Sequence, residues 1–286
     1  MQENTFIYST GILGLSRKET AKTIAARFGT EAAYKGAPTF EYTVRDKAGR
    51  KWRIAKDGRF FTPELTREDL DSAEVFKDLS EAGARSEGAA SVALPIAGHN
   101  GVTLRNLVNI IASKQVLVFK ALGIDEKYTF KQEFVDYLNQ VRVCTIENFL
   151  EIAGSFGGDE ASPGLGFTQD SISFRWFPAA LEPEYIKAYI QFAQALNRMA
   201  LAQKHSTPRV TGGENEKYIF RVWLLRLGFI GDEYKTARKL FLDRLSGNGA
   251  FRTEEAMREA LAKRKTRTGE NAEDSLISCF QILSGR

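Results

Sequence analysis

The sequence is poor in the residues that build metal sites and disulfide frameworks. Its 286 residues include 2 cysteines and 2 histidines, and Cys144 and Cys279 are too far apart to form a CxxC motif. A disulfide framework or a zinc site is therefore not expected. With so few imidazoles, the usual general bases are also scarce, and no nucleophile motif accompanies His99 or His205. We predict no metal site and no cofactor.

Long apolar runs and a signal segment are also lacking. The longest apolar helical pattern, 104–122, contains Arg, Asn and Lys residues at five positions. A membrane span needs about 20 predominantly apolar residues. Residues 1–9 show no basic stretch followed by an apolar one, which a signal peptide would require. We therefore expect a soluble protein of the cytoplasm with no membrane partner.

The composition is that of a globular protein with a real core. Hydrophobic residues make up 43% and charged residues 27% of the chain, which are ordinary values. A strand is predicted over 6–8 and a helix over 17–28, where Ser16 and Glu19 have the spacing of a capping box. Apolar residues that alternate over 40–54 around an Asp-Lys-Ala-Gly turn indicate a hairpin, and a short strand is expected at 60–61.

The second half of the chain is dominated by helical patterns. Strands are predicted over 91–96 and 172–176, and long helices over 103–122 and 184–203. We predict an α+β fold, with a small N-terminal β-α-β-hairpin unit followed by a larger, mostly helical α/β unit with a helical C-terminus. The polar, glycine- and alanine-rich segment 86–90 indicates a linker. The predicted divisions are a small α/β domain at 1–62, a connecting segment at 63–90, an α/β domain at 91–203, a basic helical hairpin at 204–252, and a C-terminal helix and tail at 253–286.

Positive charge is concentrated in the C-terminal third. Residues 204–267 contain 15 Lys and Arg against 8 Asp and Glu, although the whole chain has a net charge of only +4. Helices are predicted over 215–227, 232–245 and 254–264. The first two are joined by a glycine-containing turn, which resembles a helix-turn-helix in outline. A basic region of this kind suggests a polyanionic partner, and the alternative is a solvated helical surface.

Five basic residues of these helices are the candidate binding site. At helical spacing they share exposed faces, while Trp223, Tyr234 and Phe241 occupy the opposite faces. Basic stripes contact phosphates without reading a base sequence. We therefore predict that nucleic acid or another partner binds Lys217, Arg221, Lys235, Arg238 and Lys239. By the period of their elements, Trp176 and Trp223 are predicted to be core residues.

The same segment carries a family resemblance. The residues are Arg-Leu-Gly-Phe-Ile-Gly-Asp-Glu-Tyr-Lys at 226–235, with supporting matches at 16–19, 35–40, 113–115 and 174–178. They resemble the "virulence-related protein" family of Firmicutes phages and mobile elements. The resemblance implies a mobile-element setting in a bacterial host cell. It implies no catalytic residues.

Two functions then remain open, and a third is disfavoured. One is a non-enzymatic binding protein that engages nucleic acid or a host nucleoprotein complex through the basic helices. The alternative is a protein-binding inhibitor of a bacterial defence system, such as an anti-CRISPR factor. An enzyme is disfavoured, because no acid, base and nucleophile set converges in the sequence.

Overall fold

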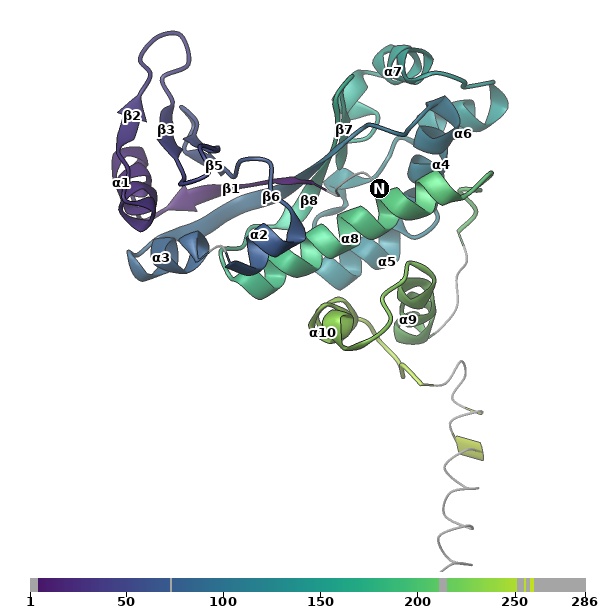
Figure 1. The fold of residues 1–286 in the computed structure, drawn as a ribbon. Helices are drawn as coiled ribbons and strands as arrows, with labels where there is room; N and C mark the ends of the chain where they lie inside the picture. The colour runs from purple at the N-terminus through teal and green to yellow at the C-terminus, as the bar shows by residue number, and fades with distance from the viewer. Residues whose placement is uncertain (1–4, 73, 211–214, 251–254, 256–257, 260–286) are drawn as a thin grey trace, which may run out of the picture.

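The chain folds around one eight-stranded antiparallel sheet (Figure 1). The computed structural model describes residues 5–72, 74–210, 215–250, 255 and 258–259. The strand order is β2-β3-β4-β5-β1-β6-β8-β7. The strands are β1 (Ile7–Leu13), β2 (Ala32–Tyr34), β3 (Tyr42–Arg45), β4 (Lys51–Ile54), β5 (Arg59–Phe61), β6 (Arg85–Pro95), β7 (Leu165–Phe167) and β8 (Ser171–Pro178).

Helices precede, connect and follow these strands, so the predicted α+β class is confirmed. No helix of the described part of the chain is long and apolar enough to cross a membrane. The predicted helix over 254–264 lies almost entirely outside the described residues. The helices are α1 (Arg17–Phe28), α2 (Arg67–Ser72), α3 (Val75–Glu81), α4 (Gly101–Ala112), α5 (Gln115–Leu122), α6 (Gln132–Gln140), α7 (Ile146–Ser155), α8 (Pro183–Ala202), α9 (Glu216–Arg226) and α10 (Lys235–Asp243).

The sheet runs across the predicted domain boundary. β1 pairs with β5 on one side and with β6 on the other, so the first half of the chain hydrogen-bonds directly to the second. The predicted linker at 86–90 is wrong, because these residues lie inside β6. Small and polar residues of this kind are also typical of linkers. In the structure they occupy a strand between two neighbours, where small residues fit as well as large ones.

The helix cap at Ser16 agrees with the sequence prediction, whereas the predicted long helix over 103–122 does not. The helix over 17–28 has the predicted capping box, with the Glu19 amide donating to Ser16 and Glu19 accepting from the Ser16 amide. The single helix predicted over 103–122 is instead two helices, α4 and α5. Lys114 separates them, because its φ of −134° lies outside the helical region.

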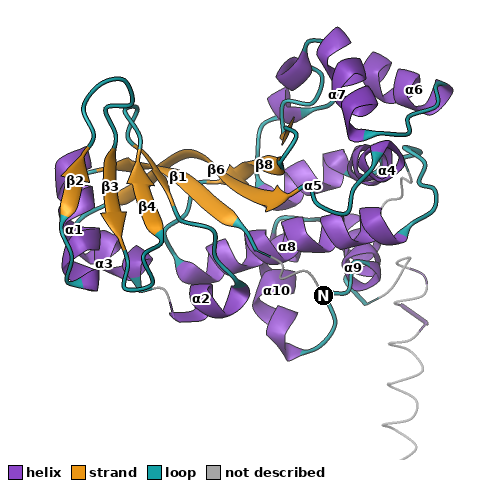
Figure 2. Ribbon diagram, turned by 45° about the horizontal axis from the view of Figure 1, so that its top comes forward, coloured by secondary structure: helices purple, strands orange, loops and turns teal. Residues whose placement is uncertain are grey.

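The two faces of the sheet differ in their cover. Tyr8, Trp52, Phe60 and Phe174 point from one face into the core and are fully or almost fully buried. Helices α1, α2, α3 and α8 lie on that side of the sheet (Figures 1 and 2). On the other side, no helix of the described residues lies over the central strands, and only the β2–β3 loop and the α6–α7 region rise at the two ends (Figure 1). We call this second side the open face.

Candidate functional site

A cross-strand row on the open face brings together polar residues from separate parts of the chain. Arg53 on β4 is opposite Phe61 on β5, Phe61 is opposite Ser9 on β1, and Ser9 is opposite Ser91 on β6. The side chains of alternate residues in a strand point to one face. The core-facing neighbours of these residues are buried, so the row itself lies on the open face. Small residues thus occupy the middle of the row.

Arg53 presents a guanidinium whose donors are largely free. Its Cζ stacks on the Phe61 ring, 4.2 Å from the centroid. Its Nη1 lies 3.8 Å from the Glu41 carboxylate, which is paired more closely with Lys51 at 2.9 Å. No hydrogen bond from the Arg53 guanidinium to another described residue is present. An arginine that is held by stacking keeps its planar set of donors available for a carboxylate or phosphate.

Arg59 lies beside this row and is held more firmly. Its Nη1 donates to the Ser9 hydroxyl at 3.2 Å, and its Nη2 donates to the Ala89 carbonyl at 2.9 Å. The side chain therefore bridges β5, β1 and β6. A guanidinium has five N–H donors, so these two bonds leave donors that can reach a ligand on the open face.

A third arginine closes the far end of the row. The β6–β8 register shifts between Ala90 and Val92, which places Ser91 opposite Arg175 and Trp176. Trp176 is buried in the core, so Arg175 is the one on the open face. Arg175 lies against Gly166, where an added Cβ would meet its guanidinium, and it forms an ion pair with Asp159.

A depression of about 560 Å³ adjoins Arg53 at the near end of the row, lined by the described residues Thr39, Glu41, Arg53, Ala55, Lys56 and Asp57. Phe40 borders it with a φ of 51°, a left-handed conformation that is uncommon outside glycine. Arg17 holds this backbone by donating to the Phe40 carbonyl at 2.6 Å, and the Lys56 amine lies 5.2 Å from the Phe40 ring centroid. Strained residues of this kind cluster at ligand-binding sites.

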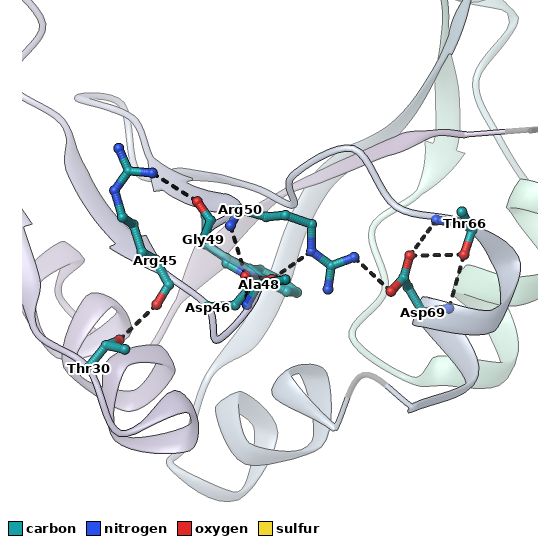
Figure 3. A network of polar contacts seen from close by, with 9 residues as sticks. Thr30, Arg45, Asp46, Ala48, Gly49, Arg50, Thr66 and Asp69 are labelled. Carbon is teal, nitrogen blue, oxygen red and sulfur yellow. Dashed lines mark hydrogen bonds and ion pairs between the residues drawn. The ribbon is translucent and has the colours of Figure 1, made fainter.

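An ion-pair network fixes the hairpin that carries Arg53 (Figure 3). Arg50 pairs with Asp46 at 2.8 Å and with Asp69 at 2.7 Å, which ties the β3–β4 turn to α2. Asp46 also accepts from the amides of Ala48 and Arg50. Burial opposes ionisation of both carboxyls, but hydrogen bonds from Arg50 and neighbouring donors outweigh it. The pKa of Asp46 and the pKa of Asp69 are both held below the usual Asp value.

Replacing Arg50 with Met is expected to lower the free energy of unfolding by about 1.5–3 kcal/mol, because buried Asp46 loses a charged partner. The lowered aspartate pKa values make this contribution present above the unfolded pKa of about 3.9 and lost as pH falls through the folded values. The difference from the parent chain should therefore be constant near neutral pH and shrink below about pH 4. Urea unfolding across this range measures it.

The matched control for that measurement is Arg45→Met. Arg45 is on the same hairpin and is exposed, and its guanidinium donates only to the Gly49 carbonyl, at 2.8 Å, among the described residues. Its replacement should change stability by less than about 0.5 kcal/mol. An equal loss in both variants, or a loss for Arg50→Met that does not depend on pH, contradicts the role of the network.

The five predicted binding residues do not form one exposed surface. Lys235 and Lys239 are exposed on α10. Arg238 is half-buried and donates to the carbonyls of Phe229 at 3.0 Å and Gly231 at 2.8 Å. Arg221 is also half-buried and donates to the Gly249 carbonyl at 3.1 Å, and Lys217 is half-buried on α9. The prediction that all five face solvent is therefore wrong for both arginines, which fasten loops within the fold.

The predicted core tryptophans and His99 have structural positions. Trp176 is fully buried and Trp223 is 7% exposed, so their burial is confirmed. The His99 ring lies 2.7 Å from Asn197 Oδ1 and 3.0 Å from Thr103 Oγ1, which fastens the turn after β6 to α8. Burial lowers the pKa of His99, which favours the neutral form of the ring.

Comparison with known proteins points to an enzyme. Residues 6–78 match the model of a family described as "Putative amidoligase enzyme". A comparison with curated proteins finds no match. The matched segment runs from β1 to α3 and contains Ser9, Arg53, Arg59 and Phe61 of the open face. Ser91 and Arg175 lie outside it.

This match contradicts three of our predictions. The chain was expected to be a non-enzymatic binding protein, with a defence inhibitor as the alternative, and to lack enzymatic activity; a family of amide-forming enzymes indicates the opposite. It gives no support to a phage, nucleic-acid-binding or anti-defence role. The resemblance to the virulence-related family is a separate matter and stays a prediction.

No contiguous motif marks this site, so the sequence did not predict it. The open face takes one or two residues from each of β1, β4, β5, β6 and β8. The sequence does contain one indication of the site. Arg53 alternates with the apolar Trp52 and Ile54, and Arg59 precedes the apolar Phe60, so both arginines are expected on the polar face of their strands. Among the described residues, no group of three or more His, Cys, Asp or Glu side chains is placed to hold a metal ion. We assign no residue to metal binding.

Proposed function

We propose that this chain is an amide-bond-forming ligase whose substrates bind on the open face of the sheet. The observation that carries the proposal is the amidoligase match over residues 6–78, together with the positions of Arg53 and Arg59, which that segment places beside each other on this face. Amide ligation joins a carboxylate to an amine. Guanidinium groups are the side chains best suited to hold a carboxylate or a phosphate in a fixed orientation.

The chemistry requires an activated carboxyl group, because a carboxylate oxygen does not leave as hydroxide under mild conditions. In the proposed reaction, a carboxylate oxygen attacks the terminal phosphorus of a nucleoside triphosphate, and the diphosphate leaves. The amine then attacks the acyl carbon, phosphate departs with the original carboxylate oxygen, and the proton that the amine loses passes to that phosphate. Arg53 and Arg59 would hold the anionic groups and offset the charge that builds on the transferred phosphoryl group.

The balance of oxygen atoms gives a direct test. The full chain is incubated with ATP, magnesium and a panel of ¹⁸O-labelled carboxylic acids, each paired with ammonia or an amino acid. Mass spectrometry should show an amide product and one ¹⁸O atom in the released phosphate for each amide formed. Absence of any amide across the panel, or phosphate free of ¹⁸O, contradicts the proposal.

Removing the Arg53 charge is expected to weaken the reaction without unfolding the protein. Arg53→Met keeps a side chain that packs on Phe61 but removes the guanidinium. Loss of one charged hydrogen-bonding contact should lower kcat/KM for the carboxylic acid by about 10–100-fold. Arg53→Lys should recover only part of this loss, because a lysine cannot make two parallel bonds.

Arg45→Met, on the same hairpin, is the control and should keep the activity of the parent chain. Thermal unfolding of all three variants is measured in parallel. Equal activity in Arg53→Met and Arg45→Met would remove Arg53 from the site.

A further inference from the structure

A second cavity, of about 940 Å³, lies among the helices that cover the other face of the sheet. Its walls are the end of α5, the segment from Pro178 into the first turns of α8, and α10. Figure 1 shows α10 beneath α8. Ligand sites for small molecules commonly have volumes of about 300–1,000 Å³. None of this cavity belongs to the segment that matches the amidoligase family, and none of its walls lies on the open face.

The charges in this cavity are divided unequally between its walls. Glu182 and Glu184 line it from the start of α8, whereas Lys235 and Lys239 line it from α10. No ion pair within 4.0 Å joins these side chains to each other in the described part of the chain. Opposite charges that share a cavity without pairing leave both kinds of group available to a ligand placed between them.

The floor between the walls is held in place by the sheet. The Tyr8 hydroxyl donates to the Ala180 carbonyl at 2.7 Å, which ties this floor residue to β1. Tyr189 stacks on Phe177 with a centroid distance of 4.7 Å and an interplanar angle of 16°. Contacts of this kind keep the cavity preformed, so a ligand does not have to order its walls.

One further basic residue lines the α10 wall, and the net charge decides the ligand class. Arg244 lies against the end of α5, where an added Cβ at Gly123 would meet its guanidinium. Asp243 adds one carboxylate to the same wall, which keeps an excess of cations, and the whole lining contains three cations and three carboxylates. A polyphosphate would place its charge beside three carboxylates, and juxtaposed like charges cost several kcal/mol. A ligand that carries one group of each sign meets a partner on both walls.

We infer that this cavity binds a short peptide or peptide-like conjugate that has both a free amino group and a free carboxylate. The amine lies against Glu182 and Glu184, and the carboxylate lies against Lys235 and Lys239. Tyr185, which is 45% exposed and also lines the cavity, covers the ligand between its two ends. This role replaces the nucleic-acid contact that was predicted for the two lysines, and it does not depend on the ligase proposal.

The test compares probes that differ only in the charge of one end. Trialanine, N-acetyl-trialanine, trialanine amide and ATP are titrated into the full chain, and binding is followed by chemical-shift changes. Trialanine should bind most tightly. Acetylation or amidation should each weaken binding by about 10–100-fold, because each removes one charged contact.

Matched variants identify which wall recognises which end. Glu182→Gln with Glu184→Gln should weaken trialanine and the amide, yet leave N-acetyl-trialanine unchanged. Lys235→Met with Lys239→Met should show the reverse pattern, with N-acetyl-trialanine weakened and the amide unchanged. Lys22→Met on α1 and Glu133→Gln on α6 are the controls and should change no affinity.

Three results with the parent chain overturn the inference. They are no shift change with trialanine, equal affinity for trialanine and both capped forms, and tighter binding of ATP than of trialanine. If the variants of either wall change the affinity for all probes equally, the two walls do not distinguish the two ends of the ligand, and the inference is likewise overturned. Failure of this test leaves the ¹⁸O experiment untouched, since that experiment concerns the open face.

Discussion

A chain divided between Ala84 and Arg85 is expected to give two fragments, neither of which folds alone. The cut separates β1 from β6. These strands pair along their length, from Ile7 opposite Ala93 to Leu13 opposite Arg85, with one register shift. The N-terminal fragment would expose an unpaired edge of β1 and the core side of the sheet. Such an edge favours aggregation rather than an independent fold.

The measurement is urea unfolding followed by circular dichroism for each fragment and for the two fragments expressed together. The separate fragments should show no cooperative transition, and the pair should regain one. A cooperative transition in the fragment that ends at Ala84 would contradict this prediction and restore the two-domain interpretation that the sequence suggested. The hydrogen bond from Tyr8 to Ala180 also crosses the cut and should be absent from either fragment.

Replacing Trp176 with Ala is expected to lower the free energy of unfolding by about 3–5 kcal/mol, as for other buried large aromatics. The indole is fully buried and packs edge-to-face against Phe119, Phe174 and Phe177 at centroid distances of 6.2, 5.8 and 6.3 Å. It also lies against Gly164, where an added Cβ would come within 2.3 Å of the ring. The loss therefore combines removed apolar burial with a cavity that the neighbouring rings cannot fill.

Two variants control for this measurement. Trp176→Phe keeps a ring in the site and should cost less than the Ala variant, since the cavity is smaller. Ile230→Ala removes a side chain that is 67% exposed and should change stability by less than about 0.5 kcal/mol. Thermal and urea unfolding of the three variants give the comparison. An unfolding midpoint for Trp176→Ala equal to that of the parent chain would show that the indole is not a core residue.

The sequence by itself determined the features that depend on neighbours along the chain. The capping box at Ser16 and Glu19, the hairpin over β3 and β4, and the burial of Trp176 and Trp223 follow from local spacing and periodicity. The same reasoning gave the α+β class. These features need only a few residues, because a helix cap involves the first turn of the helix and strand alternation has a period of two residues.

The tertiary structure decided everything that depends on strand order. Alternation shows that Arg53 and Arg59 share a face of their strands, but it cannot show which strands become neighbours. Placing β1 between β5 and β6 brings Ser9, Arg53 and Ser91 into one row, and it turns a predicted linker into a strand. Likewise, the sequence showed the charges of Lys235 and Lys239, but only helix packing set them opposite the acidic start of α8. Contacts between residues far apart in the chain are fixed by the packing of the whole core, and no local pattern records them.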